Sequence, residues 1–138
     1  MRTKLASVAA CMVLLLAALP VLAHHSFDKD FNGDKTALVQ GKITQVVWKN
    51  PHVDVYIDAR DPDGTTATWM VEMGSQSDLK ATGWKKDFLK VGDQIVADGW
   101  AARDGGRRVN AKMITVVSTG RTLDAASSFY GQHTPISN

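Results

Sequence analysis

Hydrophobic and polar residues alternate most regularly along residues 52–60. The apolar positions of this alternation are Val53, Val55, Ile57 and Ala59. A period of two is typical of a strand with one buried face. Residues 61–64, Asp-Pro-Asp-Gly, follow as a turn in which proline fixes one backbone angle and glycine supplies a positive φ. The pattern therefore predicts a hairpin whose second strand covers residues 66–73.

The rest of the chain alternates less regularly but still divides into elements. The further elements that we predict are strands over residues 36–49, 94–102 and 107–118, and a short helix over residues 76–82. Gly41 lies where a strongly bent first strand needs a small residue. Ser75 or Ser77 is expected to cap the start of the helix, and Gly83 to end it.

The order of these elements predicts the fold class. Three strands, a short helix and two more strands is the order of the OB barrel, a small five-stranded Greek-key barrel. We therefore expect an all-β domain over residues 36–119, with one short helix between strands three and four. Another small barrel or an open sheet is the alternative. Residues 24–35 are expected to form an extended N-terminal arm, and residues 120–138 an irregular C-terminal tail.

Residues 1–23 predict export. Arg2 and Lys4 precede an apolar stretch over residues 5–22, and Val21-Leu22-Ala23 places compact residues before a cleavage point. This is the pattern of a secretory signal peptide. An uncleaved membrane anchor is the alternative, because the stretch is close to the roughly 18 residues that a spanning helix needs. Cleavage after Ala23 would leave a periplasmic or secreted protein without a stable membrane anchor.

Cleavage also changes the charge and the available chemistry. The chain has 16 basic and 14 acidic residues, and Arg2 and Lys4 leave with the signal, so the mature protein is close to neutral. No concentrated basic stripe remains, which argues against nucleic-acid binding. Cys11, the single cysteine, also leaves. Because the chain has no serine-nucleophile elbow or phosphate loop, we expect a binding or accessory module rather than an enzyme.

Histidines are the remaining candidates for chemistry. If cleavage follows Ala23, His24 carries a free α-amine, and that amine and an imidazole can chelate a metal together. A second imidazole, from His25 or from His52, would complete an all-nitrogen site of the kind that favours Cu(II). The sequence therefore predicts a copper site at His24, His25 and His52. The alternative is that the pair is an exposed terminus and that His52 only stabilises a turn. We assign no role to His133.

The outer face of strands two and three is a second candidate site. OB barrels bind ligands on this face. The side chains that we expect to contribute there are Asp54, Tyr56, Met70, Glu72 and Trp48. Pairing of the two strands can place Glu72 or Met70 opposite His52 or Asp54. The expected ligand is a small molecule or a periplasmic protein. Trp69 and Trp84 are expected to pack in the core, whereas Trp48 and Trp100 can close the barrel or line a groove.

Several short motifs, in order along the chain, resemble one family. These motifs are Ala23-His24-His25-Ser26-Phe27, Gly41-Lys42-Ile43, Trp48-Lys49-Asn50-Pro51-His52-Val53, Gly74-Ser75, Gly83-Trp84, Gly92-Asp93 and Ala102-Arg103-Asp104-Gly105. Together they resemble the bacterial secreted family catalogued as domain of unknown function 6152. The resemblance implies an exported small β-domain with no established activity, and it supplies no catalytic residues. A copper-dependent oxidative enzyme remains a third hypothesis beside the copper carrier and the metal-free module.

Overall fold

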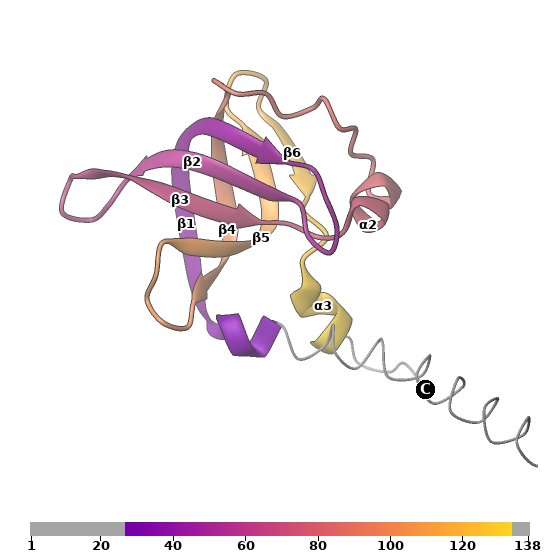
Figure 1. Ribbon diagram of the computed structural model, residues 1–138, viewed down its shortest axis with the longest axis horizontal. Coiled ribbons are helices and arrows are strands. Elements are labelled where there is room, and N and C mark those ends of the chain that lie inside the picture. The colour runs from indigo at the N-terminus through magenta and orange to yellow at the C-terminus, as the bar shows by residue number, and fades with distance from the viewer. Residues whose placement is uncertain (1–26, 134–138) are drawn as a thin grey trace, which may run out of the picture.

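The computed structural model describes residues 27–133, most of which form a strongly curved sheet (Figure 1). A helical turn over residues 27–30 leads into the sheet. The strands are β1 (Phe31–Val47), β2 (Asp54–Arg60), β3 (Thr66–Glu72), β4 (Gln94–Ala102), β5 (Arg108–Val116) and β6 (Arg121–Asp124). The helices are α2 (Gln76–Ala81) and α3 (Ser128–His133). The prediction of a mostly β protein is confirmed. Within residues 27–133, no helix is both long and apolar enough to cross a membrane.

The six strands form one sheet in the order β3-β2-β1-β4-β5-β6. All neighbours in this order are antiparallel. A short parallel pairing of β3 with β5 then joins the first strand of the order to the fifth. β1 pairs with β4 over residues 36–42 and with β2 over residues 41–47, so it changes partner near Gly41. A Cβ atom at Gly41 would lie 2.5 Å from the carbonyl oxygen of Asp58, which confirms the need for glycine there.

The strand boundaries follow the alternation in the sequence closely. Asp54 pairs with Glu72, Tyr56 with Met70 and Asp58 with Thr68, so these six side chains share one face of the β2–β3 hairpin. The alternate residues Val55, Ile57 and Val71 are fully buried. Ser75 accepts a hydrogen bond from the Asp78 N–H at 3.2 Å and caps α2, and Gly83 follows the helix with a φ of 93°.

The main core lies inside the curved sheet. Its largest fully buried side chains include Ile43, Ile57, Met73, Leu79, Ile95 and Ile114. Trp84 is buried and donates its indole N–H to the Asp124 carbonyl at 2.7 Å. Trp48 and Trp69 are partly buried and pack against the same cluster. The expected core position of Trp84 is thus confirmed, whereas Trp69 and Trp48 cover the edge of the core and keep part of their surface exposed.

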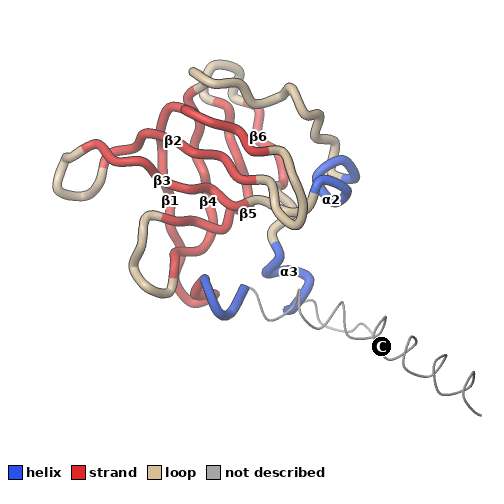
Figure 2. Tube along the Cα trace, viewed as in Figure 1, coloured by secondary structure: helices blue, strands red, loops and turns tan. Residues whose placement is uncertain are grey.

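A second, smaller cluster joins the two ends of the described chain. Phe27, Phe31 and Trp100 are almost fully buried together, and Phe129 packs against them. The Phe129 ring stacks on Trp100 with a centroid distance of 4.2 Å and lies 5.1 Å from Phe27. The helical turn and α3 consequently lie side by side at one end of the sheet (Figures 1 and 2).

The structure corrects the sequence prediction at both ends of the domain. The expected extended arm of residues 24–35 is instead, where it is described, a helical turn followed by the start of β1. Burial of Phe27 at 1 % exposure explains this, because the turn brings that ring into the second cluster. The expected irregular tail from residue 120 contains β6 and α3. β6 forms by pairing with β5, an interaction that its own four residues do not reveal.

Candidate functional site

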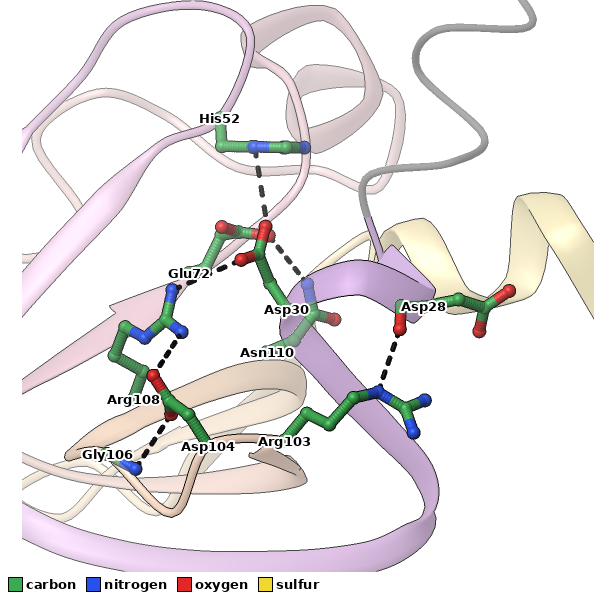
Figure 3. Close-up of polar contacts among 9 residues, drawn as sticks. All are labelled: Asp28, Asp30, His52, Glu72, Arg103, Asp104, Gly106, Arg108 and Asn110. Carbon is green, nitrogen blue, oxygen red and sulfur yellow. Dashed lines mark hydrogen bonds and ion pairs between the residues drawn. The ribbon is translucent and has the colours of Figure 1, made fainter.

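Three segments that are far apart in the sequence meet at one end of the sheet. They are the helical turn of residues 27–30, the segment before β2 that carries His52, and the turn between β4 and β5 (Figure 3). Arg103 joins two of them: its Nε donates to the Asp28 carbonyl at 2.8 Å, and its guanidinium also donates to the Phe31 carbonyl at 3.1 Å. The helical turn is therefore fixed to the sheet by hydrogen bonds from the Arg103 side chain to its backbone, as well as by the buried Phe27 ring.

His52 lies beside the side chain of Glu72. Its Nδ1 is 3.7 Å from the Glu72 carboxylate, and the two side chains are 22 % and 14 % exposed. His52 is held in place because its neighbour Val53 exchanges backbone hydrogen bonds with Met73 and Gly74. An imidazole whose Nδ1 faces a carboxylate has its Nε2 directed away from that carboxylate. The Nε2 of His52 could therefore bind a ligand while Glu72 faces its Nδ1.

Glu72 is in turn oriented by a buried polar chain. The Asn110 amide donates to the Glu72 carboxylate at 2.9 Å and to the Ser128 hydroxyl at 3.3 Å. The Ser127 hydroxyl donates to the Asn110 carbonyl oxygen. Asn110 is 1 % exposed and Ser127 5 %. A buried amide with all these partners rigidifies its surroundings, so the position of the Glu72 carboxylate is set from the interior of the protein.

Burial also sets the electrostatics of this end. It raises the pKa of the Glu72 carboxyl, and the nearby His52 and the Asn110 hydrogen bond only partly oppose the shift. Burial likewise raises the pKa of Asp54, the residue paired with Glu72, against the opposing charges of His52 and Lys49. With two carboxyl groups beside one histidine, this end of the sheet favours the binding of a positively charged group over a negatively charged one.

Arg108 forms ion pairs with two further carboxylates, Asp30 and Asp104, at the same end of the sheet. Its guanidinium lies 3.6 Å from the Asp30 carboxylate and 3.2 Å from that of Asp104. It also lies over the Phe31 ring, 5.6 Å from the ring centroid. The Gly106 N–H donates to Asp104 and, with Arg108, lowers the pKa of that carboxyl. Arg108 and Arg103 therefore both hold the helical turn in place, through the contacts with Asp28, Asp30 and Phe31.

Comparison with known proteins gives this chain a family but no activity. The family model of DUF6152, a family of unknown function, matches residues 11–111. The chain belongs to DUF6152. No curated protein matches it. Three of the motifs on which the resemblance rested contribute to the site: the first supplies Phe27, the third supplies His52, and the last supplies Arg103 and Asp104. Within this DUF6152 domain, residues of these three motifs therefore lie at the same end of the sheet.

The predicted site residues are only partly brought together. His24 and His25 lie outside the described residues. His52 and Glu72 are in contact, with Asp54 close to both. Tyr56 and Met70 form the next pair on the same face of the hairpin, two register positions beyond the pair of Asp54 with Glu72. Trp48 is partly buried and packs against the main core. From residue 27 to residue 133, no three His, Cys, Asp or Glu side chains are grouped closely enough to hold a metal ion.

Sequence reasoning missed four residues of the site: Asp30, Arg103, Arg108 and Asn110. The motif Ala102-Arg103-Asp104-Gly105 of the family resemblance contains Arg103, but nothing in the sequence showed that its side chain reaches the Asp28 and Phe31 carbonyls. Asn110 gave no signal, because a single amide in an apolar strand is not distinguishable from a surface position. Its role depends on the parallel pairing of Glu72 with Asn110 across β3 and β5.

Proposed function

We propose that this DUF6152 protein is exported, loses its signal peptide before His24, and binds Cu(II) at its new N-terminus. In this proposal the five strands β1 to β5 form an OB-type barrel. The pairing order, the β3–β5 contact and the position of α2 between β3 and β4 support that assignment. The barrel acts as a scaffold that holds the N-terminus beside His52.

The observation that carries the proposal is the burial of Phe27 in the second cluster, at the same end of the sheet as His52. Phe27 is 1 % exposed, and Asp30, one helical turn later, is near enough for its charge to act on Glu72. His24 precedes Phe27 by three residues, and three residues span at most about 10 Å. In a mature chain that begins at His24, the α-amine would therefore lie within about 10 Å of the anchored Phe27.

The donor types match copper chemistry. An α-amine and the imidazoles of His24, His25 and His52 make an all-nitrogen set, which favours Cu(II) or Ni(II). The α-amine has a reference pKa of about 7.7 to 8.0, so the metal displaces a weakly held proton near neutral pH. Within the described residues, His52 has its Nδ1 beside Glu72, and a carboxylate in that position orients a ligating imidazole. The donors that the described residues lack would come from His24 and His25.

Metal titration of the exported protein tests the proposal. Intact mass first establishes whether the chain begins at His24, and calorimetry then measures Cu(II) binding. We expect His24→Ala to weaken binding by more than about 100-fold, and His52→Ala by about 10-fold or more. His133→Ala is the matched control and should bind as the parent does. Equal affinity of the parent and His24→Ala, or no Cu(II) binding by a chain that starts at His24, would overturn the proposal.

A metal-free binding module is the second candidate. It is favoured by the continuous polar face of the β2–β3 hairpin, where Tyr56 pairs with Met70 beside Asp58 and Thr68. A groove of about 480 Å³ begins at the edge of this face, at Asp58 and Thr66. A small ligand or periplasmic protein bound there would perturb these residues in copper-free protein, which NMR chemical shifts would detect. If copper does bind, oxygen consumption with an added reductant separates an oxidative enzyme from a copper carrier.

A further inference from the structure

β1 has an edge without a strand partner over residues 36–40. β1 pairs with β4 as far as Lys42, but its pairing with β2 begins only at Gly41. Further along, the Ile43 N–H donates to the Asp93 carbonyl and the Ile43 carbonyl accepts from the Gly92 N–H. In an antiparallel pair, alternate residues direct their backbone groups to the same neighbour. The N–H and C=O groups of Leu38 and Gln40 therefore point away from β4.

No strand among residues 27–133 lies along this edge to pair with those groups. The edge ends at a fork, the point where β1 and β2 separate after the Gly41–Ala59 pair. Two grooves of about 310 and 480 Å³ meet at the fork, and Gln40 and Arg60 line both of them. The smaller groove runs along β1. Its remaining lining residues are Ala37, Leu38, Val39, Asp61, Pro62 and Trp69.

An apolar side chain stands beside the free backbone groups. Leu38 is 74 % exposed, and Trp69 and Pro62 line the groove next to it. Exposed strand edges are normally protected by charge, proline or a covering segment, because they pair readily with other chains. An exposed leucine on an unpaired edge is therefore typical of a strand that receives another strand rather than one that avoids it.

The fork also carries positive side chains without a side-chain partner among the described residues. Among the described residues, neither the Arg60 guanidinium nor the Lys42 ammonium, both of which line the larger groove, takes part in a hydrogen bond or ion pair with a side chain. Asp61, by contrast, is neutralised by Arg107 at 2.7 Å. Asp61 lines only the smaller groove, and the carboxylate of the larger groove, Asp58, accepts a hydrogen bond from Thr68. The fork thus offers two free cations against one carboxylate.

We propose that this edge binds the extended C-terminal segment of a partner protein, with the terminal carboxylate held at Arg60. A strand added along residues 36–40 cannot continue past Gly41, because β2 already occupies that side of β1. The added strand must end at the fork, where a chain terminus fits and a continuing chain has to turn away. Its backbone pairs with Leu38 and Gln40, and the groove beside Trp69 selects an apolar side chain.

A paired peptide library tests this inference. The probe is a set of N-acetylated hexapeptides with free C-terminal carboxylates, together with the same set amidated, applied to the exported protein in chelator. We expect peptides that bind to lose about 10-fold or more in affinity on amidation, since a hydrogen bond to a charged group is lost. Arg60→Gln should abolish that difference. Lys86→Gln, which removes an exposed cation away from the grooves, should preserve it.

A second variant tests the backbone part of the inference. Leu38→Pro removes an N–H that faces the free edge and leaves the hydrogen bonds to β4 intact, a position where strands tolerate proline. We expect it to weaken both peptide forms about 10-fold while the thermal unfolding midpoint stays close to that of the parent. Absence of any carboxylate-dependent binding, or its survival in Arg60→Gln, would overturn the proposal. Selective binding of the chain's own hexapeptide, residues 133–138, would overturn the assignment to a partner. Because chelator is present, these outcomes are independent of copper.

Discussion

The end of the sheet that carries His52 and the fork between β1 and β2 differ in how their polar groups are used. At the first, Arg103, Arg108 and Asn110 are all bound to other parts of the protein. At the fork, Arg60 and the backbone groups of Leu38 have no such partners among the described residues. The polar groups of the first region are held by contacts within the protein. In the proposed copper site, this region contributes only His52, and the other metal donors come from the N-terminus. The second region is open to an outside chain.

Truncating one apolar residue in each region should give the largest contrast. Phe27→Ala removes a fully buried ring from the second cluster, and we expect a loss of about 3 to 5 kcal/mol in the free energy of unfolding. Leu38→Ala removes a side chain that is 74 % exposed, and should change it by less than about 0.5 kcal/mol. Urea unfolding of the two variants measures both values, and similar losses would contradict the contrast.

A smaller difference is expected for the polar residues. Asn110→Ala leaves Glu72 and the Ser127 hydroxyl without their buried partner, which should cost about 1 to 3 kcal/mol of unfolding free energy. Gln40→Ala at the fork should cost less than about 0.5 kcal/mol. If Asn110→Ala were as stable as the parent in the same measurement, the buried polar chain would not be what fixes Glu72.

The two arginines extend the comparison to charge. Arg103→Gln removes the hydrogen bonds to the Asp28 and Phe31 carbonyls, and we expect a loss of about 1 kcal/mol together with faster amide exchange in residues 28–31. Arg60→Gln should leave stability and exchange unchanged. Hydrogen exchange followed by mass spectrometry gives this readout, and protection of residues 28–31 that survives in Arg103→Gln would break the comparison.

The pH dependence of Glu72 gives the smallest predicted effect. Burial raises its pKa in the folded protein, so the protonated form is favoured by folding. That contribution is fully present below the unfolded value of about 4.3 and is lost as the pH rises through the raised pKa. In chelator, Glu72→Gln should therefore be at least as stable as the parent at pH 7, and the difference should disappear below about pH 4. Destabilisation confined to pH 7 would contradict this assignment.

The sequence alone predicted the β2–β3 hairpin and the need for a small residue at position 41. Alternation along residues 52–60 and 66–73 predicts the β2–β3 hairpin. It left open whether Glu72 or Met70 lies opposite His52 or Asp54, and the structure pairs Asp54 with Glu72. The position of Gly41 likewise follows from the bend of β1. These features depend on local periodicity and on steric limits, both of which a single chain displays directly.

The convergence of the site was not predictable in the same way. The helical turn at Phe27 and the strand β6 both depend on tertiary partners, Trp100 in one case and β5 in the other. Asn110 and Arg108 acquire their roles only because β5 brings them beside Glu72 and Asp30. Pairing between distant strands carries no local signature, so the sequence proposed Glu72 as a neighbour of His52 without revealing that Asn110 orients Glu72.

The most direct test of the central claim is to block the α-amine of His24 and measure Cu(II) binding again. Near pH 6.5 acetylation favours this amine over lysine, because its pKa of about 7.7 to 8.0 is far below the lysine value of about 10.4. The account predicts that the acetylated protein binds Cu(II) more than about 100-fold more weakly than the untreated protein, and that the electron paramagnetic resonance signal of a nitrogen-ligated site is lost. An unchanged affinity and an unchanged signal after acetylation would contradict it.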